Sequence, residues 1–226
     1  MTPSQDYIAT WFYRESHEEA SFYPQGGRGD SSLIHSIYMQ IQVPFFVTFR
    51  HYNPKAKMLF FTNLEEEKLP YYLKELFRDT GAEVVTRPYA CRPPKNWYKA
   101  WMSQFYVYDV MTEMKRRMRP DDTLLICDAD CLCRHPLDGL FQSVREKGSA
   151  LYDMGCPEDY PINGTTLRDM ETVYTGCYGT SPSAPVHYYG GEFIALRGDA
   201  VAAVCRERPV LWEYNFHLPP DAPRLH

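Results

Sequence analysis

Short apolar runs alternate with segments of helical periodicity along this chain. Short runs rich in β-branched and aromatic side chains favour strands. The predicted strands are Tyr7–Tyr13, Met58–Thr62, Glu83–Thr86, Thr123–Cys127, Ala150–Met154 and Phe193–Leu196. Apolar residues three and four positions apart predict helices over Ser32 to about Gln42, Leu69–Thr80, Asn96–Met118, a segment opened by Pro136, and Asp199 to about Arg208. This alternation predicts a single α/β domain with a doubly wound, mostly parallel sheet.

Three segments refine this picture. Leu124–Cys127 is apolar at every position, which is typical of a strand buried on both faces in the middle of a parallel sheet. Arg14–Asp30 is polar and rich in glycine, and Gly155–His187 has few periodic apolar positions, so both are predicted to be loops. In such a fold, ligands bind beyond the carboxyl ends of the strands.

Length and charge limit the classes of partner. The 226 residues suffice for one domain with a full core. The 24 basic and 29 acidic side chains give a net charge of −5, which argues against nucleic acid or an anionic membrane as the main partner. A bound phosphate group must then be neutralised locally, by a metal ion or by a few placed cations. Aromatic residues make up 15% of the chain, which is typical of a large aromatic core and also of sites that bind sugars or bases.

The sequence also carries information about the compartment. No apolar stretch reaches the ~18–20 residues of a membrane span, and the first residues lack the basic start and apolar centre of a signal peptide. We therefore expect a cytoplasmic protein without an integral membrane segment. The seven cysteines do not form metal-type pairs and are expected to be free thiols.

The leading candidate for chemistry is Asp128-Ala129-Asp130, directly after the strand that ends at Cys127. Two carboxylates at the end of a central strand repel each other unless a cation or proton lies between them. Hard oxygen ligands suit Mg²⁺ or Mn²⁺, which in turn bridge phosphate oxygens. The alternative is a pair of solvated turn carboxylates, one of which caps the following helix.

The segment Leu124–Phe141 resembles the strand, DxD and helix region of GT-A fold glycosyltransferases, most of all the retaining galactosyltransferase and glycogenin-like group. Two further segments resemble the same group. Trp97–Trp101 is similar to its aromatic and basic segment before the DxD strand, and Tyr188–Leu196 is similar to its small-residue strand near the transferred sugar. The three segments occur in the family's order between Tyr7 and Arg208.

The resemblance implies one GT-A (Rossmann-like) nucleotide-diphosphosugar transferase domain over residues 1–226, with a nucleotide-binding half at about 1–135 and an acceptor- and sugar-binding half at about 136–226. It implies metal-dependent transfer of a hexose from a nucleotide-diphosphate sugar, expected to be a UDP-sugar, to a glycan or another hydroxyl acceptor. Asp128 and Asp130 would hold the Mn²⁺ or Mg²⁺, and Ala129 would lie against the nucleotide sugar.

Other expected site residues follow from the same comparison. Thr10, Trp11, Phe12 and Tyr13 lie near the end of the first strand, where the base should bind through backbone contacts and ring stacking. Lys99, with Lys95 as a substitute, is expected to contact the diphosphate or a sugar hydroxyl; alternatively it is an exposed helix lysine.

The acceptor side has its own candidates. Gly190 and Gly191 would let the backbone approach the ligand, or would form a bulge at the start of a strand. Glu192 is the carboxylate expected beside the reacting sugar or the acceptor hydroxyl, with Asp153 as its competitor. Whether configuration is retained or inverted stays open.

A third metal ligand is also left open. Members of the family usually have a histidine late in the chain that completes the metal site. Either His217 or His226 substitutes for it, or the chain lacks its C-terminal end. The loop Gly26–Gly29 is not expected to cradle a phosphate, because it lacks the spacing of such motifs and begins 13 residues after the first strand.

Two other functions are compatible with the sequence. A non-catalytic domain that binds nucleotide sugars or glycans would keep the same core. A haloacid-dehalogenase-like phosphotransferase also places DxD after an apolar strand, but Leu132 occupies the position where that class usually has Thr or Val, and three predicted strands precede the motif.

Overall fold

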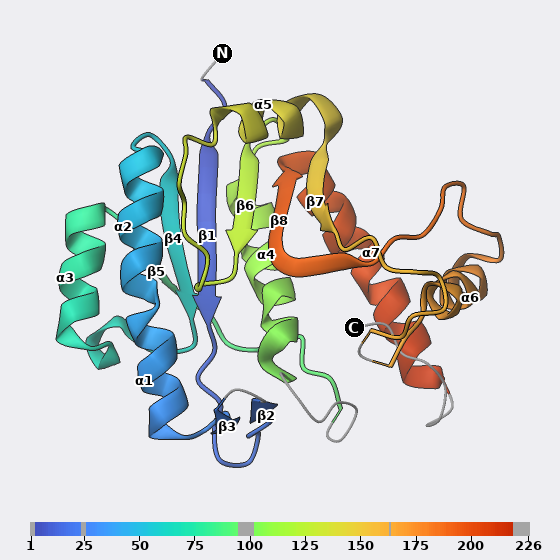
Figure 1. The fold of residues 1–226 in the computed structure, drawn as a ribbon, viewed down its shortest axis with the longest axis horizontal. Coiled ribbons are helices and arrows are strands. Elements are labelled where there is room, and N and C mark those ends of the chain that lie inside the picture. The colour runs from blue at the N-terminus through green and yellow to red at the C-terminus, as the bar shows by residue number, and fades with distance from the viewer. Residues whose placement is uncertain (1–2, 24–25, 95–101, 163, 219–226) are drawn as a thin grey trace.

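The computed structural model describes residues 3–23, 26–94, 102–162 and 164–218. A six-stranded sheet lies between two layers of helices (Figure 1). Its strands are β1 (Asp6–Phe12), β4 (Lys57–Thr62), β5 (Glu83–Thr86), β6 (Thr123–Cys127), β7 (Ser149–Asp153) and β8 (Tyr189–Arg197), while β2 (Phe22–Tyr23) pairs with β3 (Gly27–Arg28) in a separate hairpin. The α-helices are α1 (Ser32–Gln40), α2 (Gln42–Tyr52), α3 (Tyr71–Thr80), α4 (Val107–Arg117), α5 (Asp138–Lys147), α6 (Leu167–Tyr178) and α7 (Gly198–His217). Two short 3₁₀ turns are η1 (Glu66–Lys68) and η2 (Met102–Tyr106).

The strand order places β1 and β6 at the middle of the sheet. The order is β5-β4-β1-β6-β8-β7, with β5, β4, β1 and β6 parallel and β8 antiparallel to both of its neighbours. The chain passes from β1 to β4 and β5 on one side and then crosses to β6 on the other side, so the strand order reverses between β1 and β6. Every residue of β6 is buried, as its apolar sequence predicts. The prediction of a mostly parallel α/β sheet is confirmed.

Each face of the sheet carries its own apolar core. One core packs α1, α2, α3 and α5 against the sheet and is rich in phenylalanine. Within it, Phe60 of β4 lies 5.0 Å from Phe77 of α3 and 6.2 Å from Phe46 of α2, measured between ring centroids. The other core packs η2, α4 and α7 against the opposite face. Much of the aromatic content of the sequence therefore serves packing.

The sequence pattern does not predict α2. Pro44 interrupts the apolar pattern, but it occupies the first turn of the helix, where its missing N–H has no intrahelical partner in any case. Phe45, Phe46 and Phe49 then follow at helical spacing and are buried in the core. Tertiary packing therefore stabilises a helix that the local pattern left undefined.

The prediction of a loop over Gly155–His187 is wrong, because α6 lies within it. Thr166 caps this helix by accepting a hydrogen bond from the Asp169 N–H at 3.1 Å, and the Asp169 side chain accepts from the Thr166 N–H at 2.9 Å. The helix lies apart from the sheet and packs on α7 (Figure 1). Gly176 permits this contact, since a Cβ there would lie 1.9 Å from the Tyr214 hydroxyl.

Other segments also differ from the predictions. The last helix was expected to stop near Arg208, but α7 continues through Pro209 to His217. Of the helix predicted over Asn96–Met118, residues 96–101 lie outside the described residues, and the remainder is η2 followed by α4. The predicted loop Arg14–Asp30 contains the β2–β3 hairpin.

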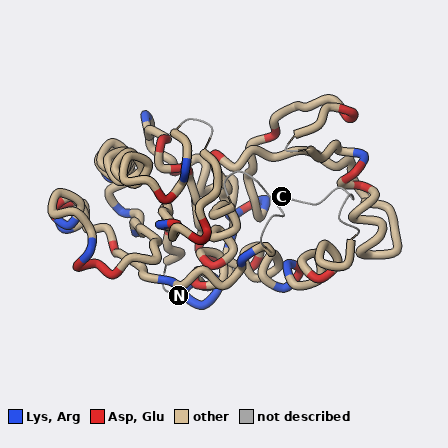
Figure 2. The backbone as a smooth tube through the Cα atoms, turned by 90° about the horizontal axis from the view of Figure 1, so that it is seen from below, with Lys and Arg blue, Asp and Glu red and all other residues tan. Residues whose placement is uncertain are grey.

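The surface mixes charges of both signs. Basic and acidic residues are interspersed along the chain rather than gathered on one side (Figure 2). In the described part of the chain, no helix combines the length and apolar character that a bilayer-spanning segment needs.

The packing predicts how two phenylalanines differ in their contribution to stability. Phe60→Ala should lower the free energy of unfolding by ~3–5 kcal/mol, because Phe60 is fully buried and its removal leaves a cavity in the aromatic core. Phe22→Ala is the matched control, with a ring that is 54% exposed and an expected change within about 0.5 kcal/mol. Urea unfolding curves of both variants measure the difference, and equal losses would contradict the described core.

Candidate functional site

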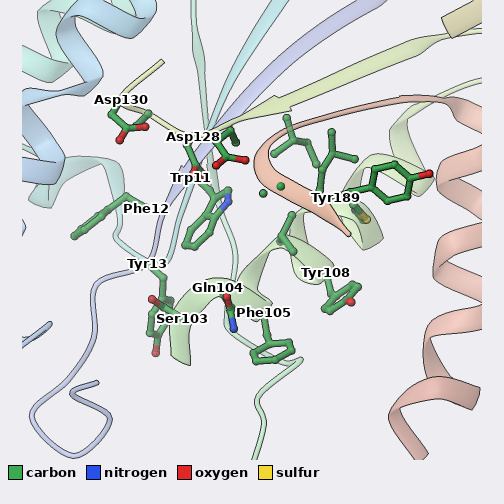
Figure 3. A pocket seen from close by; sticks show the side chains of 18 of the residues that line it. Trp11, Phe12, Tyr13, Ser103, Gln104, Phe105, Tyr108, Asp128, Asp130 and Tyr189 are labelled. Carbon is green, nitrogen blue, oxygen red and sulfur yellow. The ribbon is translucent and has the colours of Figure 1, made fainter. Parts of the chain in front are cut away.

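A cavity of about 740 Å³ opens at the carboxyl ends of β1 and β6. Its volume lies within the ~300–1,000 Å³ typical of small-molecule sites. Side chains from the ends of β1 and β6 converge on it with others from η2, α4 and β8 (Figure 3). The reversal of strand order between β1 and β6 explains its position, because the two connections leave the sheet in opposite directions and leave a crevice between them.

Asp128, Ala129 and Asp130 form a turn at one side of this cavity. The Cys131 N–H donates to the Asp128 carbonyl at 3.1 Å, and the Asp128 N–H donates to the Glu192 carbonyl of β8 at 3.0 Å. This bond fixes the turn to the neighbouring strand. Asp128, Asp130 and Glu192 all line the cavity, so the structure brings together three of the carboxylates predicted from the sequence.

These carboxylates share a region of unbalanced negative charge. Burial, together with the nearby charges of Asp130 and Glu192, raises the pKa of the Asp128 carboxyl to about 6. Asp128 opens into the cavity, but the surrounding protein limits its solvation. No lysine, arginine or histidine among the described residues forms an ion pair with any of the three. Carboxylate oxygens are hard donors of the type that divalent cations such as Mg²⁺ prefer, and the charge of this group is not compensated.

Trp11, Phe12 and Tyr13 form an aromatic wall at the end of β1 (Figure 3). Tyr13 is fixed at its hydroxyl, which donates to Glu19 Oε2 at 2.8 Å and accepts from Arg92 Nη2 at 2.9 Å. Arg92 also pairs with Glu19, and its guanidinium lies 5.8 Å from the centroid of the Tyr13 ring. The ring is therefore held in place before any ligand binds.

A second group of polar residues supports the cavity below this wall. Ser103 of η2 shares a 2.8 Å hydrogen bond with the Tyr23 hydroxyl, and both residues line the cavity. Behind them the buried carboxylate of Glu15 accepts from the Ser21 N–H at 2.8 Å and from the Ser21 hydroxyl at 2.7 Å. The Ser21 hydroxyl in turn accepts from the Met102 N–H at 3.3 Å. This network ties the loop after β1 to η2.

Several of these lining residues were missed by sequence reasoning. Tyr38, Ser103, Gln104 and Tyr108 line the cavity but belong to no motif. Burial raises the pKa of the Tyr38 phenol, and Asp128 and Asp130 raise it further, which places this ring close to the carboxylates. The local sequence gives no signal for these residues, because their positions depend on how distant elements pack.

The two glycines of β8 have different surroundings. A Cβ on Gly190 would lie 2.0 Å from Glu192 Oε2 and 2.8 Å from Tyr152 Cδ1, whereas a Cβ on Gly191 would meet nothing within 4 Å. Gly190 therefore makes room for the Glu192 carboxylate, and a register shift in the ladder lies opposite, between Leu151 and Tyr152. Gly191 leaves the backbone open at the cavity.

Not every predicted site residue lies at the cavity. Thr10 is buried and does not line the cavity; it lies two residues before the end of β1, on the face of the sheet that α1 and α2 cover. Asp153 ends β7 outside the lining and pairs with His187 Nδ1 at 2.8 Å.

The remaining candidates are distant or not described. His217 Nε2 lies 3.1 Å from Glu213 Oε1 at the end of α7. Lys95, Lys99 and His226 lie outside the described residues, as do Trp97 and Trp101. Within the described ranges, no cluster of three or more His, Cys, Asp or Glu side chains is arranged to hold a metal ion. Asp128 and Asp130 are thus a pair of carboxylates without a third such side chain arranged beside them in the described ranges.

Comparison with known proteins gives a result for the fold. No family model and no curated protein matches the chain. Among solved structures, galactosyltransferase LgtC in complex with donor and acceptor sugar analogues matches with a TM-score of 0.50 and 11% identity over 95% of this chain. An active-site mutant of LgtC gives a TM-score of 0.50 and 12% identity. Mouse xyloside xylosyltransferase 1 in its apo form gives a TM-score of 0.46 and 14% identity, over 96% of this chain and 73% of that one.

The fold is of the GT-A type. The central sheet and its helical layers thus agree with the fold that the DxD segment suggested. The chain spans 66% of the length of LgtC, just under two thirds. The division into a nucleotide-binding and an acceptor-binding half stays a prediction, and both halves contribute strands to one sheet.

The raised pKa of Asp128 predicts an unusual effect of its removal. Its native pKa of about 6 exceeds its ordinary value of 3.8, so the folded state binds more protons than the unfolded state between these pH values. Stability contributed by this group is therefore lost as the pH rises through about 6. Asp128→Asn should raise the melting temperature at pH 7 in metal-free buffer, and the gain should disappear near pH 4.

Asp153→Asn is the control with the opposite sign. The Gly155 N–H lowers the pKa of the Asp153 carboxyl, with His187 adding to the effect, so its contribution is present at neutral pH and is lost as the pH falls through the lowered native pKa. This variant should melt at a lower temperature than the parent at pH 7. Melting curves from pH 4 to 8 test both, and a loss of stability in Asp128→Asn at pH 7 would contradict the described charge cluster.

Proposed function

We propose that this protein is a metal-dependent glycosyltransferase that moves a hexose from a nucleotide-diphosphate sugar, expected to be a UDP-sugar, to a hydroxyl acceptor. One observation carries the proposal. Asp128, Asp130 and Glu192 face a cavity at the reversal of strand order and lack a cationic partner among the described residues, opposite an aromatic wall that is already fixed.

Asp128 and Asp130 are assigned as the ligands of Mn²⁺ or Mg²⁺. A two-carboxylate set suits these ions, which keep several waters and take further oxygens from substrate phosphates. When bound, such an ion would neutralise the diphosphate and stabilise the charge that develops on the leaving group as the anomeric C–O bond breaks. The Asp128 N–H bond to the Glu192 carbonyl holds the ligand turn in register with β8, so both carboxylates keep their place.

Trp11 and Tyr13 are assigned to the nucleobase. The partly exposed Trp11 ring offers a flat apolar surface for stacking. The Tyr13 ring is buried, and its contacts with Glu19 and Arg92 reduce the entropy lost when a ligand binds. Lys99 is proposed, as the sequence suggests, to contact the diphosphate or a sugar hydroxyl.

Glu192, rather than Asp153, is assigned to the reacting sugar or the acceptor hydroxyl. Glu192 lines the cavity and has no ion-pair partner in the described part of the chain, whereas the Asp153 carboxylate is held by His187 and the Gly155 N–H. An unpaired carboxylate is free to accept a hydrogen bond from an acceptor hydroxyl.

The proposal predicts a metal-linked change in stability. UDP at 100 times its Kd together with Mn²⁺ should stabilise the folded protein by about 2.7 kcal/mol, seen as a rise in melting temperature. The double variant Asp128→Asn, Asp130→Asn should lose this rise, because it removes the assigned ligands. Asp121→Asn is the control, since this exposed carboxylate precedes β6 at the opposite edge of the sheet. Undiminished stabilisation of the double variant would refute the ligand assignment.

A donor screen tests the chemistry itself. Incubation with UDP-, GDP- and ADP-sugars and Mn²⁺ should release free sugar slowly from one donor class, and EDTA should stop the release. A binding domain without catalysis would show stabilisation but no release. Formation of a phosphoenzyme from a phosphate ester would instead favour a haloacid-dehalogenase-like enzyme.

A further inference from the structure

The cavity does not end at the carboxylates. Its lining on α4, α7, β6 and β8 includes six aliphatic side chains, which together are called the aliphatic end. The aliphatic side chains are Val107 and Met111 of α4, Ile126 of β6, Ile194 and Leu196 of β8, and Val204 of α7. In Figure 3, Asp128 and Asp130 lie on one side of the view, and Tyr108 and Tyr189 lie on the other.

This aliphatic end is unsuited to water. A buried water needs two to four polar partners; these six side chains carry no hydrogen-bonding group, and the tyrosines Tyr108 and Tyr189 each add one hydroxyl to the lining. An apolar space that stays empty costs about 24 cal/mol for each Å³, so a ligand that fills it gains both contact and transfer free energy. Nucleobases and unsubstituted sugars do not suit it, because they would leave polar groups without partners.

The polar end restricts what can be attached to an apolar ligand. Asp128, Asp130 and Glu192 line the same cavity and have no cationic partners among the described residues. A carboxylate or sulfate head group would be repelled there, whereas a hydroxyl can donate a hydrogen bond to a carboxylate. The two ends together fit a neutral head group with hydroxyls joined to an aliphatic tail. The unbranched Met111 and the branched aliphatic residues suit a flexible chain.

We propose that the acceptor is an amphipathic alcohol or glycoside whose aliphatic tail lies between α4, α7 and β8 while its hydroxyl reaches Glu192. The acceptor role rests on the proposed glycosyl transfer, but binding of the tail does not. The tail thus orients the acceptor hydroxyl toward the carboxylate end of the cavity.

A chain-length series tests tail binding without any donor. Methyl, butyl and octyl β-D-glucopyranosides are titrated by calorimetry below their micelle concentrations. Each buried methylene contributes ~0.8 kcal/mol, or roughly fourfold, so affinity should rise on the order of a hundredfold from butyl to octyl. Octanoate should bind much more weakly than 1-octanol, because its charge faces the carboxylates. The series is measured on the unmodified protein, and equal affinities for the three glucosides would overturn the inference.

Two valine variants on one helix locate the tail. Val204→Phe fills the aliphatic end and should abolish the preference for octyl over butyl. Val210→Phe is the matched control on the exposed side of α7 and should keep it. If both variants keep the full preference, the tail does not bind at this end and the assignment fails.

The same ligands separate this inference from the proposed function. If the donor is hydrolysed but the affinity for alkyl glucosides does not depend on tail length, the proposal of an amphipathic acceptor is wrong and the proposal of glycosyl transfer is unaffected. Tail-dependent binding without any donor binding would keep the aliphatic site and remove its role as an acceptor site. Faster transfer to octyl than to methyl glucoside, lost in Val204→Phe, supports both.

Discussion

The parallel pairing of β1 with β6 is the constraint on which the whole site depends. It joins Asp6–Ala9 to Thr123–Ile126 in register, so both strands end at the same edge of the sheet. The chain continues from β1 into the aromatic wall and from β6 into the Asp128 turn. Because strand order reverses here, neither connection covers the gap between them, and a cavity is left at the centre of the edge. The antiparallel strand β8 then closes the far side and supplies Glu192.

Buried carboxylates elsewhere in the molecule have partners, whereas the site carboxylates Asp128, Asp130 and Glu192 are exposed to the cavity. Glu113 of α4 is buried and pairs with Arg87, Arg116 and Arg117. The buried carboxylate of Glu15 accepts hydrogen bonds from the Ser21 N–H and the Ser21 hydroxyl. The three carboxylates of the cavity have no such partner in the described residues, and their repulsion works against folding. The uncompensated charge of these carboxylates attracts a cation to the cavity, and a nucleotide diphosphate is the ligand that such a cation would bring.

Much of the fold could be predicted from local patterns, and the limits have physical causes. The strand before Asp128 can be recognised from the sequence, because a strand buried on both faces has no polar positions. A DxD motif that follows this strand must then lie where the strand ends, at the edge of the sheet. The helix α6 was missed because its segment is rich in glycine, proline and tyrosine, although the cap formed by Thr166 and Asp169 was visible in the sequence.

The site was only partly predictable for a different reason. Asp128, Asp130 and Glu192 could be predicted from their positions near strand ends. The face on which Thr10 lies is harder to predict, because a shift of one residue along β1 would turn its side chain to the other side of the sheet. Tyr38 and Ser103 reach the cavity only because α1 and η2 pack beside it, and local sequence does not determine such long-range contacts. The aliphatic end is of the same kind, since its six side chains look like ordinary core residues until α4 and α7 are placed against the sheet.

The central claim is that the carboxylates at the β1–β6 edge bind a metal ion and a nucleotide diphosphate together. Calorimetric titration of Mn²⁺ into the protein, with and without saturating UDP, tests it most directly, because ligands that share a site must change each other's affinity reciprocally. The account predicts Mn²⁺ binding at least about tenfold tighter with UDP, equivalent to ~1.4 kcal/mol of coupling, and no such coupling after Asp128→Asn. Equal Mn²⁺ affinity in the presence and absence of UDP would contradict it.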